Sequence, residues 1–231
     1  MDAESKISGK TPVTRLQELK SEITEICKST NRDPSEIKVL LATKTQNPET
    51  LKELVKAGYS LFGENKVQEF LSKYQELKDH TITWHFIGHL QTNKAKDIVG
   101  KIKLLHSLDS LKLADKLNSL LTENLDLLIQ VNVSGEKSKY GFKPEDVPAA
   151  LKHIKENCPH LTPKGFMTMA PIGAPTRNNE TARDCFKKLK QLSVTHNLHE
   201  LSIGMSNDYR VAIDEGATLL RLGSKIFGPK T

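Results

Sequence analysis

Short apolar runs alternate with longer amphipathic stretches from residue 37 to the end of the chain. Runs of this length, bounded by polar and glycine-containing segments, are typical of strands buried in a parallel sheet. They predict strands at Ile37–Thr43, Tyr59–Phe62, Thr83–Ile87, Lys103–His106, Leu127–Val133, Lys164–Met167, Leu201–Ile203 and Thr218–Leu222.

The amphipathic stretches between these runs have the apolar spacing of helices that cover a sheet. They predict helices at Pro48–Ala57, Asn65–Lys78, Thr92–Val99, Ser110–Asn124, Glu145–Asn157, Asn178–His196 and Asp208–Glu215. A further helix, Val13–Ser29, precedes the first strand, because Leu16, Leu19, Ile23 and Ile26 follow helical spacing.

Eight strands that alternate with helices predict a single α/β domain, a (β/α)8 TIM-like barrel with an extra N-terminal helix. An open, doubly wound sheet is the alternative architecture. We expect one domain over residues 1–231, with residues 1–10 and 229–231 loose. Gly58 and Gly216 each follow a predicted helix, where a left-handed backbone conformation is needed.

Composition excludes several classes of protein. The chain has 231 residues, 37% hydrophobic and 27% charged, with a net charge of +6. Its lysines are scattered and not interleaved with aromatic residues, so we expect a solvated surface and no nucleic-acid partner. No apolar run approaches the roughly 18 residues of a membrane span, so no membrane association is expected.

The N-terminal residues are polar and lack the apolar core of a signal peptide. The three cysteines, Cys27, Cys158 and Cys185, have neither metal-ligand spacing nor an even number. They indicate reduced thiols in a cytoplasmic protein with no metal site.

Lys44 follows the apolar run that forms the first predicted strand. We expect its ammonium to be partly desolvated there, which would lower its pKa and leave a nucleophilic amine. The common use of such an amine is a Schiff base with a carbonyl, either a cofactor aldehyde or a sugar-phosphate substrate.

The loops after the seventh and eighth strands often hold phosphate in barrels of this kind. Here they contain Ser206 and the pair Gly223-Ser224. Glycine permits close backbone approach, and each serine can cap the following helix and donate a hydroxyl to an anion. Simple helix caps are the alternative role for both serines.

Arg221 shares a face of the last strand with Leu219 and Gly223, so we expect it to point into the barrel mouth. A salt bridge at the barrel rim is the alternative. Asn65, after the second strand, either caps the next helix or faces a ligand. His85 is more typical of a hydrogen-bonded core residue than of a catalyst.

The glycine-bounded segment 132–141 has the length of a lid. Lys137 and Lys139 within it are expected to be solvated, with contact to a phosphate or carboxylate as the alternative.

Seven motifs in order resemble the YggS/PROSC family of pyridoxal phosphate homeostasis proteins, from about Ile37 to Gly228. They are ATK at Ala42–Lys44, GENKVQE at Gly63–Glu69, WHFIGHLQTNK at Trp84–Lys94, KSKYGF at Lys137–Phe142, GFMTM at Gly165–Met169, IGMSND at Ile203–Asp208 and LRLGSKIFG at Leu220–Gly228. The resemblance implies the fold of the alanine racemase N-terminal barrel.

The resemblance also implies pyridoxal 5'-phosphate (PLP) as cofactor. Lys44 is then the Schiff-base lysine, and Ser206 with Gly223 and Ser224 binds the phosphate. Arg221 becomes the partner of the pyridine nitrogen, and Asn65 lies near the cofactor. The implied function is to hold PLP in the cell and to supply it to apo PLP-dependent enzymes.

Racemases with this barrel carry a further β-domain that supplies a catalytic tyrosine. We expect this chain to lack that domain, and none of Tyr59, Tyr74, Tyr140 and Tyr209 can be assigned as the second base. The expectation is therefore a monomer without robust enzymatic activity. A weakly active amino-acid racemase and a Schiff-base aldolase remain the alternatives.

Overall fold

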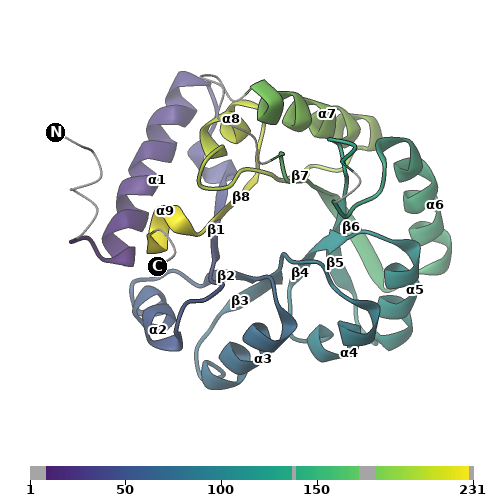
Figure 1. Ribbon diagram of the computed structural model, residues 1–231, viewed down its shortest axis with the longest axis horizontal. Coiled ribbons are helices and arrows are strands. Elements are labelled where there is room, and N and C mark those ends of the chain that lie inside the picture. The colour runs from purple at the N-terminus through teal and green to yellow at the C-terminus, as the bar shows by residue number, and fades with distance from the viewer. Residues whose placement is uncertain (1–8, 137–138, 172–179, 229–231) are drawn as a thin grey trace.

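The computed structural model describes residues 9–136, 139–171 and 180–228, and it has eight parallel strands that close into a barrel (Figure 1). The strands are β1 Lys38–Ala42, β2 Leu61–Glu64, β3 Thr83–Phe86, β4 Leu104–Leu108, β5 Leu125–Gln130, β6 Leu161–Met167, β7 Glu200–Ser202 and β8 Leu219–Leu222. Because β8 pairs with β1, the predicted (β/α)8 barrel is confirmed and the open sheet is wrong.

Helices form the outer ring, and all but α9 lie at the predicted places. They are α1 Pro12–Ser29, α2 Pro48–Lys56, α3 Val67–Glu76, α4 Ala95–Ile98, α5 Leu111–Leu120, α6 Val147–Asn157, α7 Glu180–His196, α8 Tyr209–Asp214 and α9 Ser224–Phe227. Short 3₁₀ helices occupy Pro34–Glu36, Thr92–Lys94 and Pro144–Asp146. None of the helices in the described ranges has the length and apolarity that a membrane crossing requires.

The largest boundary error concerns α5, which ends at Leu120 and not at Asn124. Leu121 has φ −86° and ψ 140°, so the backbone is already extended there. Gly58 and Gly216 have φ values of +86° and +93°, which confirms the left-handed glycines after α2 and α8. The predicted loose ends lie mostly outside the described residues, as does the predicted start of α7 at Asn178.

The extra N-terminal helix completes the ring. Since α9 is a single turn, α1 lies between α8 and α2 and contacts both of them and α9 (Figure 1). Glu22 of α1 accepts hydrogen bonds from Tyr209 and Arg210 of α8, and its other oxygen lies 3.6 Å from Nζ of Lys225 in α9. The first helix in the sequence therefore takes the place that a long helix after the eighth strand would fill.

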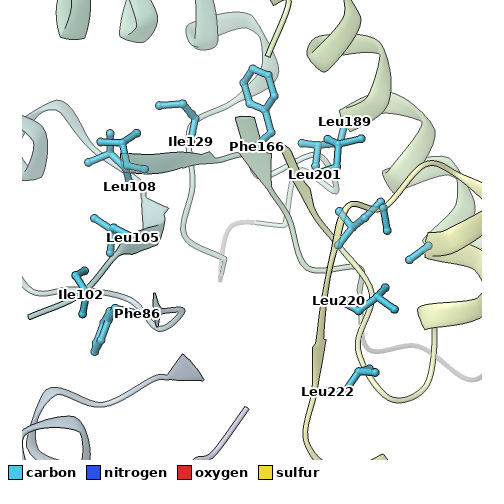
Figure 2. Close-up of a cluster of buried hydrophobic side chains, with 14 of the residues drawn as sticks. Phe86, Ile102, Leu105, Leu108, Ile129, Phe166, Leu189, Leu201, Leu220 and Leu222 are labelled. Atoms are coloured by element: carbon cyan, nitrogen blue, oxygen red, sulfur yellow. The ribbon is translucent and has the colours of Figure 1, made fainter. Parts of the chain in front are cut away.

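The main apolar core lies between the barrel and its helices. Outward-facing strand residues such as Phe86, Ile129, Phe166 and Leu220 are fully buried in it (Figure 2). Phe166 of β6, Leu189 of α7 and Leu201 of β7 come together in one cluster. The inward-facing residues are different, because several of them are polar.

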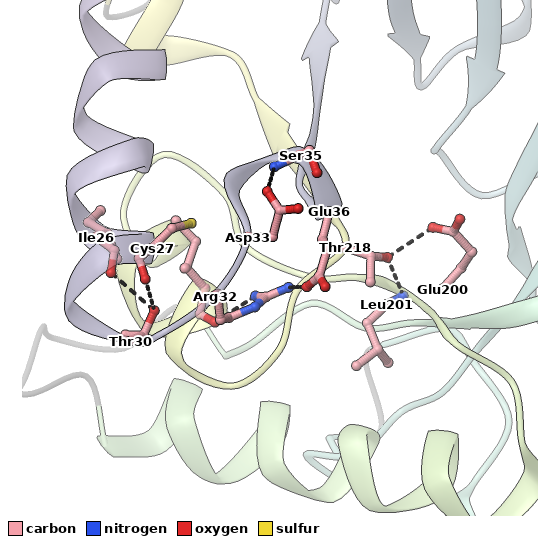
Figure 3. Close-up of polar contacts among 11 residues, drawn as sticks. Ile26, Cys27, Thr30, Arg32, Asp33, Ser35, Glu36, Glu200, Leu201 and Thr218 are labelled. Carbon is pink, nitrogen blue, oxygen red and sulfur yellow. Dashed lines mark hydrogen bonds and ion pairs between the residues drawn. The ribbon is translucent and has the colours of Figure 1, made fainter.

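Polar contacts tie the strands together at their amino ends (Figure 3). Thr218 donates a hydrogen bond to Glu200 at 2.9 Å and accepts one from the backbone of Leu201 at 2.8 Å. Nζ of Lys38 lies 3.0 Å from Glu200, which adds β1 to the set. This end of the barrel therefore contributes to stability, and the opposite end is left for function.

Close backbone packing between β6 and β7 requires a glycine at position 165. A Cβ atom there would lie 1.8 Å from the carbonyl oxygen of Glu200. A contact this short with backbone can be relieved only by separating the two strands.

We therefore expect Gly165→Ala to lower the free energy of unfolding by at least about 1–3 kcal/mol in urea denaturation. Gly9→Ala is the matched control, because a Cβ at Gly9 meets nothing within 4 Å. Equal stability of the two variants would contradict this packing constraint.

Candidate functional site

The predicted site residues follow four neighbouring strands at their carboxyl ends. Lys44 lies two residues after β1, and Asn65 directly follows β2. Ser206 is in the loop after β7, and Gly223-Ser224 directly follows β8. Because the closed order runs β7–β8–β1–β2, the structure brings these residues to one side of the barrel mouth.

The loops after β7 and β8 are held to each other. Ser206 Oγ accepts a hydrogen bond from the backbone N–H of Lys225 at 3.1 Å, so its hydroxyl hydrogen can still be donated to an anion. The expectation that each serine caps a helix is wrong. Asp208 is the N-cap of α8, and Gly223 occupies the N-cap position of α9.

Two glycines let these loops pack closely. A Cβ at Gly223 would lie 3.3 Å from the carbonyl oxygen of Ala42, so the start of α9 lies against the end of β1. Gly204, after β7, has φ +89°, and a Cβ there would lie 2.6 Å from Cβ of Ala212. The backbone geometry of both loops therefore depends on glycine.

Lys44 is exposed, which corrects the expectation of a desolvated ammonium. Thr43 is still fully buried, but the chain then turns through Thr45, whose φ is +66°. Glu69 holds this turn by accepting the backbone N–H of Thr45 at 3.0 Å, and that bond lowers the pKa of the Glu69 carboxyl. The turn lifts Lys44 out of the strand and leaves its amine accessible to a ligand.

A buried ion pair beneath this turn was not predicted from the sequence. Nζ of Lys73 lies 2.6 Å from Oε1 of Glu64 and donates to the carbonyl oxygen of Thr43 at 2.7 Å. Thr43 donates its hydroxyl to the same carboxylate oxygen at 2.6 Å. Lys73 lies on the same face of α3 as the buried residues Phe70 and Leu77. That spacing in the sequence could have predicted that Lys73 is buried.

Asn65 offers a buried polar group next to Lys44. Its Oδ1 has no hydrogen-bond partner among the described residues. It does not cap α3, because Lys66 holds the N-cap position without a side-chain bond. A Cβ at Gly88 would lie 2.0 Å from the carbonyl oxygen of Asn65, so this segment is tightly fixed. A buried, unsatisfied amide is the kind of group that a polar ligand satisfies.

Arg221 lies inside the barrel, 5% exposed. Nη1 donates to the backbone oxygen of Ser202 at 2.5 Å and to its Oγ at 2.6 Å, and Nη2 donates to the carbonyl oxygen of Thr168 at 2.9 Å. Within the described part of the chain, two of the five guanidinium N–H groups have no recorded acceptor.

These contacts decide between the two predicted roles of Arg221. Its acceptors come from the protein interior, and no carboxylate among the described residues lies within ion-pair distance. The predicted inward orientation is therefore correct and the rim salt bridge is wrong. Burial lowers the pKa of Arg221 to about 10, so the side chain is still a cation at neutral pH.

The polar chain continues across the barrel from Arg221. Nδ1 of His106 on β4 lies 2.8 Å from Ser202 Oγ on β7, and its Nε2 lies 2.9 Å from Nδ1 of His85 on β3. Because β4 and β7 are not neighbours in the barrel, this chain crosses the interior. Burial lowers the pKa of His85 to about 4, and burial also lowers that of His106. His85 is thus a hydrogen-bonded core residue, as its sequence context indicated.

The two histidines should make stability depend on pH. Their pKa in the unfolded chain is about 6.5, above the folded values, so the unfolded state binds the proton first. The groups that act on His85 are Lys38 and Glu200 at the amino end and His106 inside the barrel.

We expect the free energy of unfolding to fall as the pH is lowered from about 6.5 towards 4. From pH 6.5 to 5, His85 alone should account for about 2 kcal/mol. Denaturation of His85→Gln should give a shallower pH slope than wild type, whereas His199→Gln, at an exposed position, should keep it. Equal slopes for His85→Gln and wild type would refute the assignment.

The sequence and the fold of this chain both resemble known proteins. A family model described as the N-terminal domain of alanine racemase matches residues 16–231. The pyridoxal phosphate homeostasis protein of Aquifex aeolicus is 41% identical over 225 residues, which cover 94% of this chain and 97% of that protein. The protein of the same name from Homo sapiens is 36% identical over 210 residues, 84% of this chain and 76% of that one.

Solved structures give the same result. PipY of Synechococcus elongatus, solved with PLP bound, has a TM-score of 0.80 and 31% identity, and the match covers 94% of this chain and all (100%) of that one. An alanine racemase of Clostridium difficile has a TM-score of 0.68 and 16% identity, covering 91% of this chain and 56% of the racemase. That second likeness concerns the fold alone.

Proposed function

Because this chain belongs to the family of pyridoxal phosphate homeostasis proteins, we propose that it binds PLP at the barrel mouth and takes part in PLP homeostasis. One observation carries the proposal. A buried arginine with free donors lies inside the barrel, and an accessible lysine, Lys44, follows the neighbouring strand.

The described residues fit this cofactor. Among the residues that the structure describes, the buried amide oxygen of Asn65 has no partner, and Arg221 retains N–H groups for an acceptor on a ligand. The loops that contain Ser206 and Gly223-Ser224 are joined by the hydrogen bond from the backbone of Lys225 to Ser206. Together they offer two serine hydroxyls and backbone groups next to Lys225. When bound, PLP supplies a reactive aldehyde, an electron-withdrawing ring and a phosphate.

The family resemblance gives each residue a role that its chemistry suits. Lys44 would hold the cofactor covalently through its amine, and Ser206, Gly223 and Ser224 would hold the phosphate. Arg221 would be the partner of the pyridine nitrogen. A guanidinium gives up its proton only at high pH, so it would keep that nitrogen unprotonated and the ring a weak electron sink. Asn65 would lie near the cofactor.

This chemistry favours storage of the cofactor over catalysis. A weak electron sink gives little stabilisation to the carbanions that racemisation and decarboxylation require. We infer a cytoplasmic, monomeric protein without robust enzymatic activity, which limits free PLP and supplies it to apo PLP-dependent enzymes. The names of the relatives, which describe homeostasis and not catalysis, support this inference.

Lys44→Ala should abolish stoichiometric PLP binding. Purified wild-type protein should absorb visible light, and borohydride followed by peptide mass spectrometry should place the added mass on Lys44. Lys56→Ala is the matched control, an exposed lysine at the end of α2, and should bind PLP as wild type does.

A colourless wild-type protein that takes up no PLP would overturn the proposal and favour the aldolase alternative. Turnover of amino acids at roughly one per second or faster would instead favour the racemase. If borohydride still attaches the added mass to another lysine in Lys44→Ala, that lysine and not Lys44 is the covalent site.

Ser206→Ala should weaken PLP binding by about tenfold or more, because a hydrogen bond to a charged group contributes about 1.5–3 kcal/mol. Titration with pyridoxal, which lacks the phosphate, should give the same affinity for variant and wild type. Ser21→Ala, an exposed serine of α1 whose hydroxyl donates to Gln17, is the control. Equal losses for PLP and pyridoxal would contradict a phosphate role for Ser206.

A further inference from the structure

Three potential metal ligands converge between α5 and α6, outside the barrel mouth. Asp115 belongs to α5, His153 to α6, and Cys158 is the residue at which α6 ends. Nε2 of His153 lies 2.6 Å from Oδ1 of Asp115, and Sγ of Cys158 lies 3.6 Å from the same oxygen. The three ligand atoms all lie within 4.8 Å of one another.

We propose that Asp115, His153 and Cys158 form a binding site for a zinc-class divalent cation. A carboxylate, an imidazole and a thiolate are a ligand set that zinc accepts, and a thiolate with an imidazole disfavours magnesium and calcium. Three protein ligands leave the fourth position of a tetrahedron open to water or a small ligand. The partly exposed Asp115 and His153 give the ion access from solvent.

The observed distances suit this ion. Zinc bonds of about 2.0 Å to nitrogen and oxygen and about 2.3 Å to sulfur place tetrahedral ligands about 3.3–3.6 Å apart. The distance from Cys158 Sγ to Asp115 Oδ1 already has this value. The Asp115–His153 pair must open by only about 0.7 Å, which a small rotation of an exposed carboxylate provides.

The ion would replace two hydrogen-bonded protons. In the metal-free cluster, the thiol and the imidazole N–H are both directed at one carboxylate oxygen. On binding, the thiol proton of Cys158 and the Nε2 proton of His153 leave to solvent, and Nδ1 keeps or takes up one proton, so that the imidazole binds as a neutral ligand. Two negative ligands then balance the charge of the divalent cation.

The two helices are already fixed around the cluster. Asn118 of α5 accepts a hydrogen bond from the backbone N–H of His160 at 3.0 Å and donates to the carbonyl oxygen of Asn157 at 3.4 Å. These bonds hold α5 against the turn that contains Cys158. The site therefore needs little ordering when the ion binds.

The test uses tag-free, full-length protein and two probes, Zn²⁺ in calorimetry and Co²⁺ in absorption spectroscopy. We expect one equivalent of Zn²⁺ to bind, and Co²⁺ to give a thiolate-to-metal charge-transfer band. Cys158→Ser should abolish the band, and Asp115→Asn and His153→Gln should each weaken Zn²⁺ binding at least tenfold. The PLP content of each variant should equal that of wild type, because the proposed PLP site lies at the barrel mouth, away from these three residues. It therefore serves as the control that the variants are folded.

Cys185→Ser is the matched control, a buried cysteine on α7 that should keep full metal binding. The proposal fails if wild type binds no Zn²⁺ at 100 µM free ion, or if the Co²⁺ band persists in Cys158→Ser. It also fails if all three ligand variants bind Zn²⁺ as tightly as wild type, since the ion would then lie elsewhere.

Discussion

The hydrogen-bonded chain from His85 through His106 and Ser202 to Arg221 crosses the inside of the barrel, and the site depends on it. The interior of a (β/α)8 barrel is commonly filled by branched apolar side chains. Here a guanidinium lies among them, and an unpaired charge in such a place would be very costly. The backbone acceptors at Ser202 and Thr168 make its burial possible and fix its direction.

The first member of this hydrogen-bonded series, His85, also senses charges at the amino end of the barrel, because Lys38 lowers its pKa and Glu200 raises it. The amino end holds Lys38, Glu200 and Thr218 in a polar network that joins β1, β7 and β8. His85 lies between that network and the site residues, and burial keeps it neutral at physiological pH. The positive charge of Arg221 therefore lies inside the barrel without a carboxylate in ion-pair distance among the described residues, which suits a ligand with an acceptor atom.

Much of the architecture could be predicted from the sequence, because hydrophobic periodicity reports directly on buried strands and amphipathic helices. Parity along β8 correctly predicted that Arg221 points inward, since alternate residues of a strand face opposite sides. The expected desolvation of Lys44 was wrong, because it assumes that the buried strand continues to that residue. The left-handed turn at Thr45 ends β1 early, and the lysine becomes exposed.

The sequence by itself determined the eight strands that alternate with helices, the glycines after those helices and the strand ends where the site residues lie, whereas the pairing of β8 with β1 closed the barrel. Tertiary structure alone decided the contacts between distant segments. Glu64 with Lys73, His106 with Ser202, and Asp115 with Cys158 are each separated by 9 to 96 positions in the chain. The physical reason is that spacing along a chain constrains only local geometry, whereas barrel closure sets which distant side chains share one buried space.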